Sequence, residues 1–92
     1  APLVKAAASA ALARMGDPRG IEGLRVALGA WREGTREYAL GIVAVLGLDA
    51  LAPEVVAIAK KPGGVEPAIL RAALEALAGR SPEAKAALAD LS

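Results

Sequence analysis

The side chains that most often perform chemistry in proteins are scarce in this chain. Its 92 residues include no His and no Cys, so the commonest general base, the commonest metal ligand and the thiolate nucleophile are all missing. The aliphatic hydroxyls are Ser9, Thr35, Ser81 and Ser92. Nucleophilic catalysis needs a nucleophile, a base and a group that orients the base. The composition therefore predicts that the protein is not an enzyme, and we expect no cofactor and no metal site.

Ten carboxylates remain as candidates for acid–base chemistry, since a facing pair of them is enough to cleave a glycosidic bond. They are scattered singly along the chain. Asp17, Glu54, Glu66 and Glu83 lie at or just before expected first turns of helices, where a negative charge favours the helix dipole. Helix capping and solubility therefore explain them better than catalysis does.

A basic, glycine-containing stretch at residues 60–64, KKPGG, is the one candidate for a phosphate cradle. No Walker pattern and no G-x-G-x-x-G motif surrounds it. A plain loop between helices is the favoured interpretation, with its two lysines near the negative end of the preceding helix.

Three bases, Lys5, Arg36 and Arg71, are the strongest candidates for binding a partner, because they are spaced by 31 and 35 residues. Glu37 and Glu75 follow close behind two of them. One interpretation is a ladder of bases that meets an acidic peptide or a phosphate backbone. The other is that these bases pair with neighbouring acids such as Glu37 and Glu75 and keep this face solvated.

The elements that position these residues are expected to be helices. Ala, Leu, Val and Ile supply most of the apolar content, which is 55%, whereas aromatics make up 2%. Ala is the strongest helix former, and strands favour the β-branched and aromatic types that are thin here. The formal net charge of +1 gives no electrostatic reason to expect nucleic acid. We expect one domain over residues 1–92.

Turn signals divide the chain at nearly even intervals, each built from Gly with Pro, Asp, Thr or Ser. Thr35 and Ser81 are candidate N-caps, and Pro18, Pro53, Pro67 and Pro82 lie near helix starts. The predicted helices cover residues 3–15, 20–32, 35–47, 51–60, 66–78 and 82–91. No segment alternates with period two for long enough to form a strand. The fold class is all-α.

The 3.6-residue pattern predicts which face of each helix is buried. The buried stripe of the first helix is expected to comprise Val4, Ala7, Ala8, Ala11, Leu12 and Met15. In the second helix Trp31 closes a stripe with Ile21, Leu24 and Leu28, so it is expected to be a half-buried core anchor. The third helix is apolar on other faces too, which is typical of a central helix.

An internal repeat emerges when residues 4–16, VKAAASAALARMG, are laid without gaps over residues 35–47, TREYALGIVAVLG. A third copy covers residues 69–77. Its register is open by one residue, because either Arg71 matches Arg36 or Ala73 matches Ala39. One amphipathic helix pair cannot bury its apolar stripe alone, whereas stacked copies form a continuous core.

The first copy, from Val4 through Gly16, and the Asp17-Pro18 that follows it resemble the second helix of a HEAT repeat, particularly the short HEAT-like repeats of phycobilisome lyases. The resemblance implies a right-handed α-solenoid of about six helices in three hairpins, within a longer array. It implies that Lys5, Arg36 and Arg71 lie on a concave, partner-binding surface. The family's usual Asp between paired helices is missing from residues 30–34, which weakens the case for its Asp–Arg ladder.

The resemblance favours a non-catalytic protein-binding or scaffolding module. An alternative is a nucleic-acid-binding module of the alkylpurine glycosylase type or an accessory domain of an enzyme, and a compact helical bundle with chance periodicity is a third. The end helices of an uncapped stack expose apolar surface, so self-association is possible. Leu40, Val45 and Ile58 would mark such a surface if exposed. We expect no membrane span and a cytoplasmic location.

Overall fold

All regular structure in the computed structural model is helical within the residues it describes, which are 1–91 without the side chain of Glu33. The elements are α1 (Pro2–Arg14), α2 (Pro18–Leu28), α3 (Glu33–Leu46), the 3₁₀ turn η1 (Asp49–Leu51), α4 (Ala52–Lys60), α5 (Pro67–Ala78) and α6 (Pro82–Asp90). The prediction of an all-α fold is confirmed. No helix in this part of the chain is both long enough and apolar enough to cross a membrane.

Local signals set the starts of several helices. The Ser81 hydroxyl accepts a hydrogen bond from the Ala84 N–H at 3.1 Å, as predicted for an N-cap. The Glu66 carboxylate accepts one from the Ala68 N–H at 3.1 Å. These bonds satisfy N–H groups that have no partner inside the helix.

The turn between α2 and α3 lies earlier than predicted. Helix α2 ends at Leu28, with Gly29 as its C-cap, and α3 begins at Glu33. Thr35 is therefore buried inside the first turn of α3 and does not cap it. Glycine is a poor residue inside a helix and a good one at its end, so Gly29 marks the boundary where Gly34 had been expected to.

Trp31 consequently falls in the turn, and the prediction that it anchors the core is wrong. Its side chain is 82% exposed, and the Arg32 guanidinium lies 5.6 Å from the centre of its ring. The apolar stripe that included Trp31 assumed a helix running to residue 32.

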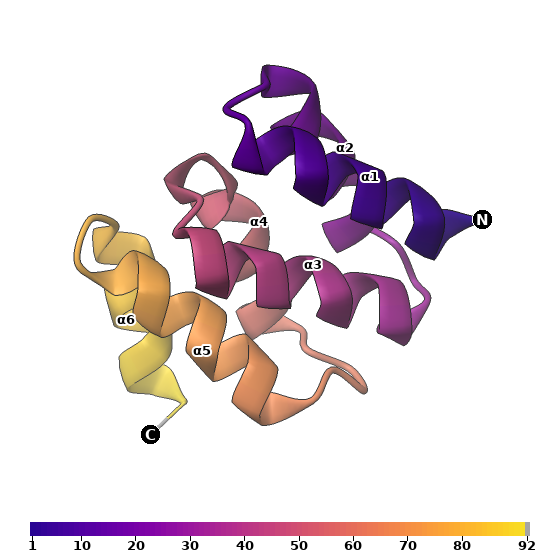
Figure 1. The fold of residues 1–92 in the computed structure, drawn as a ribbon. Coiled ribbons are helices and arrows are strands. Elements are labelled where there is room, and N and C mark those ends of the chain that lie inside the picture. Colours follow the sequence, from indigo (N-terminus) through magenta and orange to yellow (C-terminus); the bar gives the residue numbers. More distant parts are fainter. Residues whose placement is uncertain (92) are drawn as a thin grey trace.

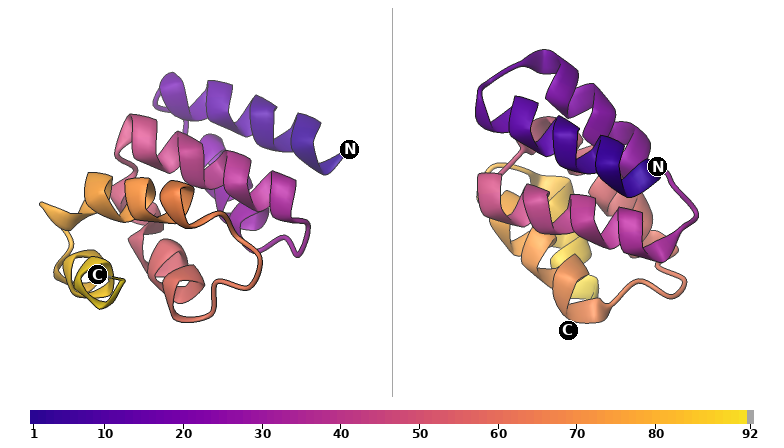
Figure 2. Two further views of the ribbon diagram at one scale, coloured as in Figure 1. Left: turned by 90° about the horizontal axis from the view of Figure 1, so that it is seen from below. Right: turned by 45° about the vertical axis from the view of Figure 1, so that its right-hand side comes forward.

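Two layers of helices make up the molecule. Helices α1, α3 and α5 lie side by side in one layer, and α2, α4 and α6 form the layer behind them (Figures 1 and 2). Helix α3 is central, since it contacts α1, α2 and α5. This position explains its broad apolar surface: Leu40 and Ile42 lie about 160° apart around the helix axis, and both are buried.

The core lies between and within these layers. Its largest fully buried side chains come from α2 through α5, and they include Leu24, Leu40, Leu51, Leu70, Leu74 and Leu77. The radius of gyration is 11.9 Å and the dimensions are 33 × 26 × 16 Å. A compact chain of this length has a radius of gyration of about 12 Å. These two layers of three helices are therefore as compact as an ordinary bundle.

Candidate functional site

Helix α1 buries a different face from the one predicted. Ala6 and Ala10 are fully buried. In contrast, Val4 is 68% exposed and Met15 is 73% exposed. Of the six residues in the predicted buried stripe, Leu12 alone is half-buried and the others are exposed. The prediction for this helix is wrong, and its bulkier apolar side chains face outward.

Close packing against α2 explains which face is buried. Gly20 of α2 is so near to α1 that a β-carbon there would lie 2.6 Å from the Ser9 carbonyl oxygen and 2.8 Å from the Ala13 α-carbon. A β-carbon on Gly23 would collide with the Ser9 side chain. Two helix backbones approach this closely only where both present small side chains, so α1 turns its small face toward α2.

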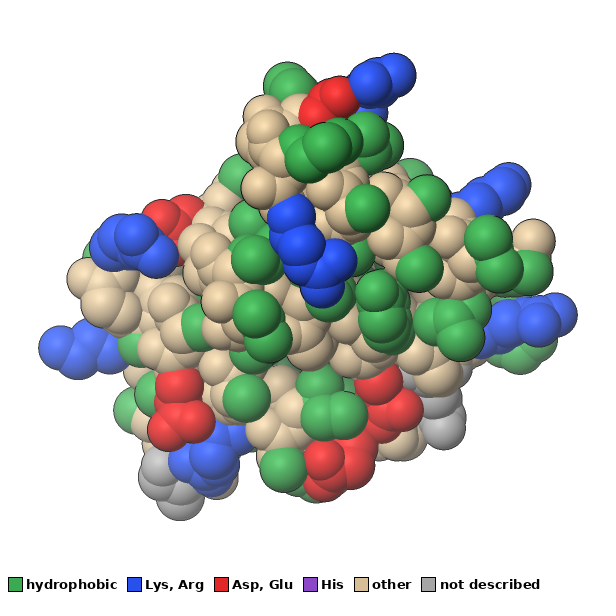
Figure 3. All heavy atoms as spheres, viewed as in Figure 1, with side chains coloured by type: hydrophobic (Ala, Val, Ile, Leu, Met, Phe, Trp, Pro, Cys, Tyr) green, Lys and Arg blue, Asp and Glu red, His purple; other side chains and the backbone are tan. Residues whose placement is uncertain are grey.

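The face left outside is apolar along its whole length. We define the outer face of α1 as the five exposed residues Val4, Ala7, Ala8, Ala11 and Met15. They recur at helical spacing and therefore form one strip. Hydrophobic side chains gather over the α1 and α3 side of the molecule, with most charged side chains around the rim (Figure 3).

The same positions in α3 are covered. The ungapped repeat places five α3 residues opposite the outer face of α1: Thr35, Tyr38, Ala39, Ile42 and Leu46. Three of these are buried, and Tyr38 and Leu46 are half-buried. Thr35 lines a hollow together with Ala6 of α1 and Gly23 of α2. In α3 this face therefore packs toward the preceding helix pair, whereas in the part of the chain that the structure describes α1 has no preceding pair.

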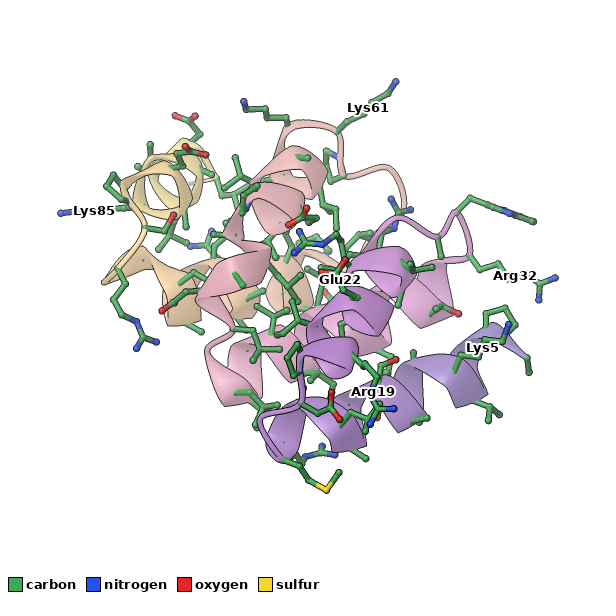
Figure 4. The ribbon with its side chains drawn as sticks, turned by 90° about the horizontal axis from the view of Figure 1, so that it is seen from above. Lys5, Arg19, Glu22, Arg32, Lys61 and Lys85 are labelled. Atoms are coloured by element: carbon green, nitrogen blue, oxygen red, sulfur yellow. The ribbon has the colours of Figure 1, made fainter. Side chains whose placement is uncertain are left out.

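Two bases border the outer face of α1 on opposite sides. Lys5 follows Val4 and Arg14 precedes Met15, and a step of about 100° per residue places them at opposite edges of the strip. Both are exposed, and α1 contains no acidic residue. Neither forms an ion pair with any side chain described in the structure. Lys5 and Arg32 both lie at the N-terminal end of α1 (Figure 4), so this end is basic.

The remaining predicted binding residues lie apart from this face. Glu37 accepts a hydrogen bond from the Glu66 N–H at 2.7 Å, which ties α3 to the start of α5. Arg71 donates to the Leu91 carbonyl oxygen at 3.3 Å. Glu75 is exposed on α5. Neither glutamate pairs with Lys5, Arg36 or Arg71 among the described side chains.

Burial fits both registers of the third repeat equally well. At a spacing of 34 residues, buried positions 39, 40 and 43 of α3 match buried positions 73, 74 and 77 of α5. At a spacing of 35 residues, buried positions 35, 39 and 42 match buried positions 70, 74 and 77. Equivalence of Arg71 to Lys5 and Arg36 therefore stays a prediction.

Arg36 belongs to a polar seam that the sequence did not reveal. Arg25 of α2 pairs with Glu54 of α4 at 2.5 Å, and this hydrogen bond raises the pKa of Arg25. Arg36 and Lys61 line the same hollow. The Arg36 Nε and the Glu54 Oε1 are buried without a protein partner, and one donor and one acceptor in one hollow suit a bridging water. Arg25 and Glu54 are 29 residues apart in the sequence, so no pattern of neighbouring residues predicts that they pair.

Comparisons with protein-family models, curated proteins and solved structures found no match to this chain. Groups of three or more carboxylates that suit a metal ion are absent from the described residues. The outer face of α1 is the candidate functional site, because it is an exposed apolar strip.

Proposed function

We propose that this chain is a non-catalytic protein-binding module made of HEAT-like helix pairs, and that the outer face of α1 is its contact surface. The single observation that carries the proposal is the exposure of an uninterrupted apolar strip on α1. Large exposed apolar patches on soluble proteins commonly mark interaction sites. Val4 and Met15 are the bulky residues of this strip, and both are more than two-thirds exposed.

Repeat architecture supplies the physical background. In a stack of helix pairs each pair buries its apolar face against a neighbour, so an exposed apolar face is one that a contact can cover. Under this proposal the three pairs form a segment of a right-handed α-solenoid that acts as a scaffold in the cytoplasm. The burial of the equivalent face in α3 supports this interpretation, because it provides an example within the chain of how such a face is covered.

The proposal predicts that Val4→Glu combined with Met15→Glu removes binding and leaves the fold intact. Neither residue belongs to the buried core, so the melting temperature should change little. A photo-crosslinking residue at position 8, compared with one at exposed position 86, would first identify the partner in an extract of the source cells. Calorimetry with the purified partner then compares the double variant with the native chain, and we expect at least a tenfold loss of affinity.

A matched control is Ala68→Glu with Ala86→Glu, which adds the same charge at exposed apolar positions on α5 and α6. This control should bind as the native chain does. Equal crosslinking at positions 8 and 86, or full affinity of the Val4/Met15 variant, would show that α1 is not the contact surface.

A further inference from the structure

A hollow beside the loop between α4 and α5 combines apolar walls with a single positive charge. Its volume is about 200 Å³. Pro62, Val65, Leu70 and Leu91 line it with apolar side chains, and Arg71 is the one charged residue among those that line it. We infer that this hollow binds a carboxylate that carries a compact apolar group. The inference goes beyond the proposed function, because α3 lies between α1 and α5 and separates the hollow from the outer face of α1 (Figure 1).

A tight turn in the loop builds one wall of the hollow. The Val65 N–H donates a hydrogen bond to the Pro62 carbonyl oxygen at 3.1 Å, and Gly63 between them has a φ of 58°. Glycine adopts this left-handed conformation without the strain that a side chain brings. Val65 is 4% exposed and belongs to the core, so packing fixes this wall.

The Arg71 guanidinium lies at the hollow with donors to spare. One of its terminal nitrogens donates to the carbonyl oxygen of Leu91 at 3.3 Å, and Leu91 lines the same hollow. A guanidinium has five N–H donors, and Arg71 forms no ion pair with any side chain that the structure describes. Arg71 is exposed, so a ligand can reach these donors.

A single guanidinium favours a carboxylate over other anions. Its planar, paired N–H groups match the two oxygens of a carboxylate. One positive charge balances a monoanion, whereas a phosphate dianion would keep an uncompensated charge beside apolar walls, which is costly. None of the residues that line the hollow is acidic, so no lining side chain repels the carboxylate.

The volume of the hollow limits the apolar part of the ligand. An apolar cavity of about 150 Å³ holds a molecule the size of benzene, so about 200 Å³ holds one ring or a short branched chain beside the carboxylate. Two sources present this chemistry. One is a free small carboxylic acid, and the other is the C-terminal residue of a polypeptide when its side chain is apolar.

Three probes separate the charge from the apolar contact. Benzoate has both a ring and a carboxylate, benzamide has the ring without the charge, and acetate has the charge without the ring. Titration of benzoate into the ¹⁵N-labelled chain should shift the amide resonances of Gly63, Val65 and Arg71, and the shifts should saturate. We expect benzamide and acetate to bind at least tenfold more weakly, because each lacks one of the two contacts.

Substitution of Arg71 tests the guanidinium. Arg71→Gln removes the charge and should weaken benzoate binding at least tenfold, with little effect on benzamide. Arg71→Lys keeps the charge but loses the paired donors, so its affinity should fall between the two. The control Lys85→Gln removes one charge from an exposed position on α6 and should bind benzoate as the native chain does. Circular dichroism checks that each variant is helical.

Two peptides distinguish the sources of the carboxylate. One is an acetylated tripeptide that ends in phenylalanine with a free carboxylate, and the other is the same peptide with an amidated end. Tighter binding of the free peptide than of benzoate would assign the hollow to a polypeptide C-terminus, whereas weaker binding would assign it to a free small acid. Both results support recognition of a carboxylate, provided that the amidated peptide binds at least tenfold more weakly than the free one.

Three results would overturn the inference. Equal affinity for benzoate and benzamide would show that the hollow does not recognise a carboxylate. Unchanged affinity for benzoate in Arg71→Gln would remove Arg71 from the site. Shifts that do not saturate, or that lie outside the loop and α5, would show non-specific binding. Each of these results would leave the proposed function of the outer face of α1 untouched.

Discussion

Asp17 illustrates how a single side chain organises a helix start. Its carboxylate accepts a hydrogen bond from the Arg19 N–H at 2.9 Å and pairs with the Arg19 guanidinium at 2.6 Å. The side-chain hydrogen bond from Arg19, followed by the backbone one, lowers the pKa of Asp17 from 3.8 to about 2. Both bonds favour the ionised carboxylate. Because Asp17 is the N-cap of α2, its ionised form stabilises the start of that helix.

The pH dependence of stability follows from the sign of that shift. Because the pKa of Asp17 is lower in the folded chain than in the unfolded one, its stabilisation is present above pH 4 and is lost as the pH falls toward 2. We predict that Asp17→Asn reduces the fall in melting temperature over this range, measured by circular dichroism at closely spaced pH values. Glu75→Gln, at an exposed position on α5, serves as the matched change of charge. An unchanged acid profile in Asp17→Asn would contradict the assignment.

At the scale of elements, the crossing of α1 and α2 decides how the N-terminal part of the chain packs. Gly20 is buried there, and a β-carbon on it would meet backbone atoms of Ala13 and Ser9. Backbone atoms cannot move aside as the tip of a flexible side chain can. The small face of α1 is therefore a requirement of this crossing.

Two glycine substitutions separate helix propensity from close packing. Gly20→Ala should lower the free energy of unfolding by about 1–3 kcal/mol, which is typical of overpacking. Gly41→Ala, inside α3, has nothing within 4 Å of its β-carbon. It should raise the free energy of unfolding by up to about 1 kcal/mol, because Ala is the better helix former. Urea denaturation measures both, and equal effects of the two changes would disprove the close approach of α1 and α2.

The sequence predicted the six helices correctly, but it predicted the wrong buried face for α1. Ser81 and Pro82 start α6 as expected, because capping depends on neighbours in the sequence. The apolar pattern of α1 assumed that its largest side chains are buried. Val4 and Met15 are exposed because α1 packs closely against α2, and only a face of α1 with small side chains allows that close approach.

At the scale of the whole molecule, α3 joins the parts into one unit. It contacts both flanking helices of its own layer and also α2 in the other layer. Of the three α3 and α4 residues whose exposure was taken to mark an end surface, Leu40 and Ile58 are buried and Val45 is 76% exposed. Leu40 and Val45 lie on the same helix but differ in burial. A comparison of substitutions at these two positions therefore tests the central role of α3.

Leu40→Ala should lower the free energy of unfolding by about 2–5 kcal/mol, as large-to-small changes in a core do. Val45→Ala, on the same helix, should change it by less than about 0.5 kcal/mol. Circular dichroism during thermal unfolding should show a single transition for both variants, because α3 couples the two layers. Two separate transitions in the Leu40 variant would mean that the helix pairs unfold independently.

The sequence by itself determined that the chain is helical, where most of its helices begin and end, and that catalytic side chains such as His and Cys are missing. Those features depend on residue type and on neighbours a few positions away. Only the tertiary structure decided which face of α1 is buried, that Trp31 is exposed, and that Arg25 meets Glu54. Each of these depends on which helices lie alongside and how closely they approach. A helical pattern marks an apolar face, but burial of that face requires a neighbour to cover it.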